Sequence, residues 1–362
     1  MTAEQVEAKY PVMTIHSRAV EENARKVVSL CAKQGIDVWG VTKGLSGDPR
    51  LAKIYESAGM KGVADSRLIN LAEVKKSGVT LPRQMMRIAM PTELEELLKV
   101  ADVSLQSDVS TILRLDDFCV AKNTAHDILL MLDVGDLREG FWPKEIAGTG
   151  AKLRDLRALR VVGVATNFAC ASGVLPTREK LEDLVSYRDR FAHAIGRELP
   201  VISVGGTCCL KAIEEGTMPR EVNQLRICEG ILLGFDTAHM REISYLSREA
   251  VVISAEVVEC REKPSVPDGE VGLQAFGEHP IFIDRGMRKR ALLAIGRQDV
   301  NISRLAPVDE GVHIVTASSD HMIVDVTEAK RPFVAGDILD FRAQYPAMLG
   351  AATSRYVSVT FR

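Results

Sequence analysis

The sequence predicts a (β/α)8 barrel followed by an all-β domain. Through the first two thirds of the chain, short apolar runs alternate with longer amphipathic segments, as strands and helices do in a parallel barrel. No Gly-x-Gly-x-x-Gly turn follows the first of these runs, which disfavours a doubly wound sheet, the competing arrangement. From about residue 245 the chain changes to short β-rich runs separated by Pro, Gly and Asp.

The apolar runs of the first region are expected to be strands because they are short and are bounded by turn residues. In chain order these runs span residues 12–16, 38–43, 62–65, 86–90, 103–106, 127–135, 159–167 and 200–206, and a last run covers 224–234.

The segments between the strands have helical spacing. In the first of them Val20, Ala24 and Val27 share one stripe, and Ser17 is a candidate cap. Gly59 is a typical stop for the second. The expected helices span residues 18–31, 51–59, 67–76, 92–100, 108–122, 143–157 and 178–196, with a short helix near Leu210.

These patterns predict two domains, a barrel over residues 1–244 and a β-domain over residues 245–362. The first dozen residues could pack on the β-domain. The expected strands of the β-domain lie within residues 250–260, 289–300, 311–317, 321–327, 336–342 and 355–361.

The composition is that of an ordinary globular chain. The net charge is −3 over 362 residues, which gives no basic surface for a nucleic-acid partner. The seven cysteines form no Cys-x-x-Cys pair, which indicates free thiols in a reducing compartment, and the seven histidines lack metal-binding spacing. No apolar run approaches membrane-spanning length, and the acidic N-terminus lacks a signal peptide's apolar core. We therefore expect a cytoplasmic protein with no membrane partner and no metal.

Lys43 ends the apolar run Val38–Val41 and precedes a glycine-rich stretch. Read alone, such a lysine extends to solvent from the end of a strand. It becomes a reactive amine if a partner exists, such as an aldehyde cofactor held as a Schiff base. That second interpretation requires a phosphate site elsewhere on the same barrel rim.

Two segments could supply that phosphate site. In "SVGGTCCL", Ser203 ends a strand, two glycines allow backbone amides to approach an anion, and Thr207 adds a hydroxyl. In "RICEGILLG", Arg226 lies at a strand end and small residues follow. Because functional side chains of a barrel gather at the carboxyl ends of its strands, Lys43 and both segments are expected on one rim.

With these segments, the chain resembles the alanine racemase superfamily, the fold-type III pyridoxal phosphate (PLP) enzymes. The resemblance covers nearly the whole chain and is closest to the ornithine racemase branch. Its most specific segments are "VGDLREG" (134–140), "NQLRICEGILLG" (223–234), "EKPSVPDGEVG" (262–272), "RKRALLAIGRQDV" (288–300) and "SSDHMIVDVT" (318–327).

The resemblance implies a role for each candidate residue. Lys43 would carry PLP and act as a base at Cα, and Arg226 would face the pyridine nitrogen, to which a guanidinium can only donate. Arg138 would lie near the cofactor's phenolic oxygen and the substrate carboxylate. The other cofactor-binding residues implied are Asn167, Ser203, Thr207, Tyr345 and the backbone amides of Cys228 and Glu229.

The chain departs from the family's pattern at four positions. Asn167 replaces a histidine that stacks on the pyridine ring, and Met131 replaces a lysine that supports the family's arginine. Arg297 replaces the tyrosine that serves as the second base, although an arginine is a poor base and suits a carboxylate clamp better. Cys228 replaces a glycine, which would cost about 1 kcal/mol if the backbone there had a positive φ.

The group that serves the second face of Cα therefore stays open. Asp299, Asp320, His321 and Cys209 are candidates, as are water and Lys43 acting on both faces. Asp320 and His321 are equally consistent with a β-turn, and Cys209 with a small core residue. Asp299 or Glu229 could instead receive the distal ammonium of a diamino acid.

The expected function is a PLP-dependent racemase acting on ornithine or a similar basic amino acid, a small substrate. The resemblance implies a head-to-tail homodimer with shared active sites. A broad-specificity racemase for alanine, serine or lysine is an alternative. PLP decarboxylases or lyases of the same architecture usually have a glutamate opposite the pyridine nitrogen, so Arg226 disfavours that function. The single-domain PLP-homeostasis proteins lack a C-terminal β-domain, so residues 245–362 count against that one.

Overall fold

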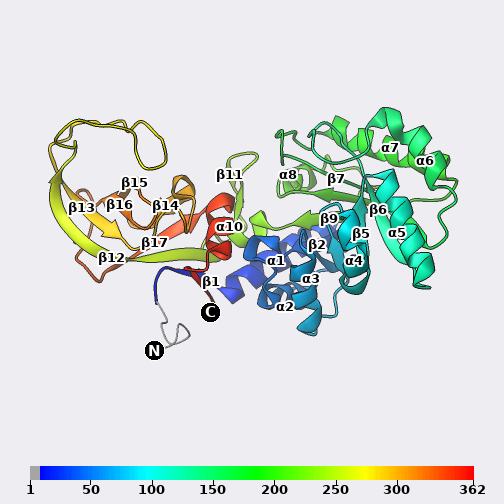
Figure 1. Ribbon diagram of the computed structural model, residues 1–362, viewed down its shortest axis with the longest axis horizontal. Coiled ribbons are helices and arrows are strands. Elements are labelled where there is room, and N and C mark those ends of the chain that lie inside the picture. The colour runs from blue at the N-terminus through cyan, green and yellow to red at the C-terminus, as the bar shows by residue number, and fades with distance from the viewer. Residues whose placement is uncertain (1–8) are drawn as a thin grey trace. The chain divides into compact units, whose positions relative to one another are not determined.

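The computed structural model describes residues 9–362, and their contacts divide the chain into two units. One unit is Ser17–Ser247, and the other combines residues 9–16 with Arg248–Arg362. Figure 1 shows the elements of both units with the labels used below.

The first unit is a closed barrel of eight parallel strands, as the sequence predicts. Each strand pairs with the next, and the last pairs with the first, so that Gly40 lies beside Ile227. The strands are β2 (Asp37–Val41), β3 (Gly62–Asp65), β4 (Arg83–Met85), β5 (Val103–Gln106), β6 (His126–Met131), β7 (Leu159–Asn167), β8 (Val201–Gly205) and β9 (Gln224–Ile227).

Helices connect these strands and cover the barrel (Figure 1). They are α1 (Ser17–Ala32), α2 (Pro49–Ser57), α3 (Leu68–Lys76), α4 (Leu94–Val100), α5 (Val109–Ala121), α6 (Ile146–Leu153), α7 (Arg178–Ile195), α8 (Cys209–Glu214) and α9 (Glu229–Leu233). The stripe of α1 that contains Val20, Ala24 and Val27 is buried, as expected from the spacing. Asp108 caps α5 by accepting the amide of Thr111 at 2.7 Å. Among residues 9–362, no helix combines the length and the apolar character needed to cross a bilayer.

Strand β4 lies before its predicted position at residues 86–90. Its central residue, Gln84, is polar and fully buried, so the strand lacks the apolar run by which it would be recognised. Met86 and Ile88, which suggested a strand, pack from an irregular segment onto the barrel's core cluster around Leu105.

The second unit is built on an eight-stranded sheet with the path β14-β17-β12-β13-β16-β15. Its first strand, β1, is antiparallel to β12 and parallel to β18, so the run at residues 12–16 belongs to this sheet and not to the barrel. The strands are β1 (Val12–Ile15), β12 (Val251–Pro264), β13 (Met287–Leu293), β14 (Leu305–Pro307), β15 (His313–Ala317), β16 (Met322–Asp325), β17 (Ile338–Ala343) and β18 (Ser358–Phe361).

One helix interrupts the β-rich second unit. Helix α10 (Tyr345–Thr353) has a proline in its first turn and is otherwise rich in Ala, Met and Leu, which favour helices. The helix packs against the 3-10 turn Ile302–Arg304, where Gln344 donates its amide to the carbonyl of Arg304. The sequence-based prediction of an all-β domain did not include this helix.

Candidate active site

Lys43 lies at the carboxyl end of β2, in the 3-10 turn Lys43–Leu45, and its side chain is half-buried. Strand β2 lies between β3 and β9, so Lys43 leaves the barrel between the strand ends that carry Asp65 and Arg226. Within residues 9–362 the Lys43 ammonium forms no hydrogen bond or ion pair. Burial raises the pKa of the neighbouring Cys228 thiol to about 12, and the charge of Lys43 opposes that rise.

Asp65 fixes the backbone beside Lys43. Its carboxylate is fully buried and accepts hydrogen bonds from the Thr42 hydroxyl at 2.7 Å and the Asn70 amide group at 2.9 Å. Burial raises the pKa of Asp65, although these hydrogen bonds oppose the shift. Because Thr42 precedes Lys43 directly, this contact determines where the lysine leaves the strand.

Arg226 lies inside the barrel mouth and is 1 % exposed. Its Nε donates to Ser203 Oγ at 3.0 Å, Nη1 to Asn167 Oδ1 at 3.1 Å, and Nη2 to the Thr166 carbonyl at 2.6 Å. Burial lowers its pKa to about 10, so the side chain is still charged at neutral pH. Gly205 leaves room for this cluster, since a Cβ there would lie 2.4 Å from Asn167 Oδ1.

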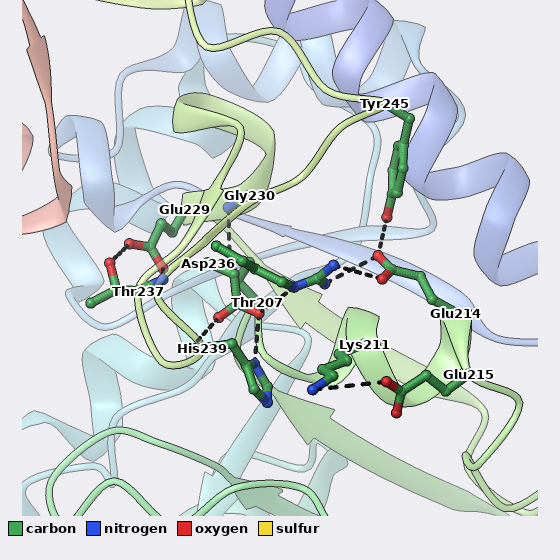
Figure 2. A network of polar contacts seen from close by, with 11 residues as sticks. Thr207, Lys211, Glu214, Glu215, Glu229, Gly230, Asp236, Thr237, His239 and Tyr245 are labelled. Carbon is green, nitrogen blue, oxygen red and sulfur yellow. Dashed lines mark hydrogen bonds and ion pairs between the residues drawn. The ribbon is translucent and has the colours of Figure 1, made fainter.

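Thr207 joins the turn after β8 to the start of α9. Its hydroxyl accepts the backbone amide of Gly230 at 2.9 Å, as Figure 2 shows, so the hydroxyl proton remains available to a ligand. Cys228 precedes α9 with a φ of −135°. The positive φ that would make a cysteine costly at this position is therefore absent.

A network of polar contacts lies next to Thr207 and Gly230 (Figure 2). Buried Asp236 lies 2.8 Å from His239 Nδ1 and accepts from Arg241 Nε at 3.3 Å. Arg241 also donates to Glu214 at 2.7 Å, and the Tyr245 hydroxyl donates to the same carboxylate at 2.7 Å. The network ties the hairpin β10 (Phe235–Asp236) and β11 (Arg241–Glu242) to α8.

Glu229, a candidate for binding a distal ammonium, is engaged by the same hairpin. The Thr237 hydroxyl donates to its carboxylate, and the Thr237 amide lies 3.4 Å away. Burial raises the pKa of Glu229. The carboxylate thus has a partner within the barrel unit.

The loop after β6 holds Arg138. Its guanidinium pairs with Glu139 through two nitrogens, and Nη1 donates to Cys170 Sγ at 2.5 Å. Burial alone would lower the pKa of Arg138, but the Glu139 carboxylate outweighs it and the net shift is upward. Sequence reasoning missed Glu139. The available signal was an acidic neighbour to an arginine inside a loop framed by Gly135 and Gly140.

The remaining candidates belong to the second unit. Arg297 donates to Glu278 at 2.7 Å, and its guanidinium lies 4.8 Å from the centre of the Phe276 ring. These residues line a cavity of about 560 Å³, which Asp299 also borders. Tyr345 begins α10, from which the next residue, Pro346, also lines this cavity.

Asp299, Asp320 and His321 occupy turns. The Asp299 carboxylate accepts the Gly296 amide at 3.0 Å and is 6 % exposed. Asp320 and His321 are exposed in the connection between β15 and β16, where the amide of Ser318 donates to the His321 carbonyl at 2.8 Å. Cys209 is buried, with its thiol 3.8 Å from the Gly205 carbonyl.

The barrel unit therefore brings together Lys43, Arg138, Asn167, Ser203, Thr207, Arg226, Cys228 and Glu229 from the candidate set. The second unit carries Arg297, Asp320, His321 and Tyr345. Met131, which stands where the family pattern has a lysine, is buried among apolar residues of the barrel core. Its thioether side chain therefore provides no polar partner that could hold Arg138.

The chain is similar to known proteins over most of its length. Residues 15–227 match the family described as alanine racemase, N-terminal domain. The chain is 41% identical over 352 residues to a lysine racemase of Thermotoga maritima, covering 97% of this chain and 98% of the relative. It is 35% identical over 349 residues to an ornithine racemase of Acetoanaerobium sticklandii, covering 96% and 98%.

A solved structure shares the fold at low identity. The alanine racemase of a D-cycloserine-producing Streptomyces lavendulae superposes with a TM-score of 0.76 at 16% identity, covering 98% of each chain. On the family match and the full-length relatives, the chain belongs to the alanine racemase family.

Proposed function

We propose that the protein is a PLP-dependent racemase that interconverts the enantiomers of a basic amino acid, lysine or ornithine. The observation that carries the proposal is the position of Lys43. It lies on the barrel rim beside β9, which holds the buried guanidinium of Arg226 and leads into the Thr207–Gly230 contact.

The residues at the rim fit PLP in three respects. The Thr207 hydroxyl still has its proton to donate to a phosphate, beside the first turn of α9. Arg226 carries only donors and stays charged, so it would leave a facing pyridine nitrogen unprotonated. The Lys43 amine has no hydrogen-bonding partner among residues 9–362, which suits a Schiff base to the cofactor.

The bound cofactor would supply an electron sink for the Cα carbanion, and the protein would move the proton. In this proposal Lys43 Nζ accepts or donates the Cα proton on one face of the amino acid. Arg138 and Arg297 bind the substrate carboxylate, since a planar guanidinium matches it with two hydrogen bonds. Asp320 and His321 are the proposed proton carriers for the second face.

The preference for a basic substrate rests on the lysine and ornithine racemases that align over nearly the whole chain. Asp299 is tied to backbone and Ser354 within its own unit, and Glu229 to Thr237, so either must exchange a partner to receive a distal ammonium. A broad racemase for alanine, serine and lysine is the alternative. A PLP-homeostasis protein would produce no enantiomer at all.

Two measurements test the proposal. Purified protein is incubated with L-ornithine, L-lysine, L-arginine, L-alanine and L-serine, and the D-product is quantified by chiral chromatography. Ornithine or lysine is expected to lead, equal rates for alanine would favour the broad racemase, and no D-product would refute the proposal. In parallel, borohydride reduction followed by peptide mass mapping is expected to place the cofactor on Lys43.

We also propose that two chains form a head-to-tail dimer with shared sites. The loop between β12 and β13 exposes a set of large apolar side chains, which a second chain could cover: Val271, Leu273, Phe276, Ile281, Phe282 and Ile283. Mixing the inactive Lys43→Ala protein with Arg297→Ala protein, which should bind substrate weakly, should raise the activity at low substrate above that of either parent. Activity that stays at the level of the parents after subunit exchange would argue against shared sites.

A cytoplasmic location is part of the proposal. All seven cysteines are free, and five of them are buried singly or side by side in the barrel unit without a disulfide. Fractionation of the source cells, followed by immunoblotting, tests it: the protein should appear with the cytoplasmic markers.

A further inference from the structure

Glu139 connects two arginines of the candidate site. It pairs with Arg138 through two guanidinium nitrogens, and its Oε1 also accepts from Asn167 Nδ2 at 3.3 Å. Asn167 in turn accepts from Arg226 Nη1 at 3.1 Å. One carboxylate thereby reaches both the loop arginine and the buried barrel arginine.

The orientation of the Asn167 amide is determined by its two neighbours. Arg226 has only donors, so the amide oxygen must face it, and the amide nitrogen must then face an acceptor. Glu139 provides that acceptor. If Glu139 were uncharged, the amide nitrogen would lose a charged partner, and the Arg226 contact would lose part of what keeps it in place.

The other carboxylates of the same loop are already engaged. Asp133 accepts the amide of Gly135 at 2.8 Å, and Asp136 accepts the amides of Ala171 at 2.8 Å and Ser172 at 3.1 Å. These contacts shape the loop, and neither carboxylate forms a hydrogen bond or ion pair with Arg138 or Arg226, although the charge of Asp136 contributes to the raised pKa of Arg138. Of the three carboxylates, Glu139 is the one that pairs directly with Arg138.

The loop backbone holds Glu139 in place. Gly140 has a φ of +141°, and a Cβ at this position would lie 2.4 Å from the Asp133 amide nitrogen. Since only glycine fits at position 140, the backbone conformation next to Glu139 is fixed. The side chain of Glu139 is 22% exposed, against 35% for Arg138.

We propose that Glu139 is the positioning residue of the site: it orients Arg138 toward the substrate carboxylate and, through Asn167, keeps Arg226 in place. This inference rests on the proposed racemase function. It also identifies what supports Arg138, because Met131 is apolar and buried in the barrel core.

The test compares Glu139→Gln with Glu139→Asp and with Glu198→Gln. The last variant removes the same charge from an exposed residue before β8, at the opposite end of the barrel. The first readout uses the protein without cofactor: 15N spectra of arginine Nε–H groups, with Arg138→Lys and Arg226→Lys samples for assignment. The second readout is KM and kcat of the cofactor-loaded enzyme.

In Glu139→Gln, the protected Nε–H signals of Arg138 and Arg226 should broaden or exchange faster. The KM for the amino acid should rise by roughly tenfold or more, because misplacement of a binding group is costly. Glu139→Asp should recover part of both effects, and Glu198→Gln should show neither. Unchanged arginine signals together with an unchanged KM in Glu139→Gln would overturn the proposal.

The two proposals fail separately. If wild-type protein neither binds PLP nor racemises amino acids, the racemase function is wrong, while the spectra still show whether Glu139 holds both arginines. If Glu139→Gln does not fold, the Glu139→Asp spectra decide, because a shortened carboxylate must also weaken the contact to Asn167. Unaltered Nε–H signals there would count against the positioning role.

Discussion

The two units differ in how they hold their candidate residues. In the barrel, Arg226, Ser203 and Asp65 are each at most 1 % exposed, and each has its hydrogen-bonding partners inside the unit. In the second unit, Asp320 and His321 lie on an exposed turn. The buried candidates of the barrel are therefore preorganised by their own unit, whereas Asp320 and His321 are held on an exposed turn and their proposed roles need a partner chain.

This difference separates stability from function. A change at a buried barrel residue disturbs a network and should affect folding and activity together. A change at an exposed turn should affect activity with little effect on folding.

The largest expected effect on stability is at Gly296, a buried glycine of the second unit. A Cβ at Gly296 would lie 2.0 Å from the Ser319 carbonyl oxygen, which is backbone and cannot turn away. Gly296→Ala should lower the free energy of unfolding by about 3 kcal/mol or more, measured by urea denaturation. Gly148→Ala in α6, with nothing within 4 Å, is the control and should be neutral or stabilising by up to about 1 kcal/mol. Equal midpoints for the two variants would show that the turn is not packed as described.

A pH-dependent effect is expected from the barrel interior. Burial lowers the pKa of His126 to about 4, and its Nε2 lies 3.0 Å from Ser104 Oγ. Since the folded pKa is below the unfolded value of about 6.5, this stability is present at high pH and is lost as the pH falls from about 6.5 toward 4.

The wild type should therefore lose about 2 kcal/mol more than His126→Gln between pH 7.5 and pH 5, measured as free energy of unfolding. If His126→Gln and the wild type show the same pH slope, His126 is not held neutral by burial.

The sequence was sufficient to predict the barrel, but it did not give the position of every strand or the sheet to which each strand belongs. Periodicity and strand-end residues predict eight parallel strands, because a parallel barrel buries each strand on both faces. Strand β4 was displaced because its buried centre is Gln84, and the run at residues 12–16 was grouped with the barrel because pairing partners are not local. Helix α10 was missed within a β-rich segment.

For the site, the sequence identified residue types but not their contacts. Lys43, Thr207 and Arg226 are marked by their position after strands, which is a local signal. The Thr42–Asp65 bond and the link from Glu139 to Asn167 join residues from different strands and loops. No spacing in one sequence encodes such contacts.

A smaller effect is expected at Arg297, and it should appear in catalysis alone. Its ion pair with Glu278 joins side chains that are 21% and 56% exposed, so losing it should cost less than about 1 kcal/mol of stability. If Arg297 binds the substrate carboxylate, Arg297→Gln should raise KM about tenfold. Arg331→Gln, which breaks the ion pair with Asp309 in the same unit, is the matched control. An unchanged KM in Arg297→Gln would remove Arg297 from the site.

The smallest effect is expected at Cys228. Its φ of −135° is not left-handed, so Cys228→Gly relieves no positive-φ strain. The variant should lose less than about 1 kcal/mol of stability through added chain entropy, and its PLP affinity should change by less than about threefold. A large gain in cofactor affinity, measured by titrating the apoprotein with PLP, would show that the cysteine hinders the phosphate.

The central claim is that Lys43 on the barrel rim exchanges the Cα proton of a basic amino acid. Wild-type protein and Lys43→Ala are each incubated with L-lysine or L-ornithine in heavy water, and Cα deuterium and optical rotation are followed together. The wild type should incorporate deuterium at Cα as optical rotation is lost, and Lys43→Ala should do neither. Deuterium incorporation and racemisation that persist in Lys43→Ala would contradict the claim.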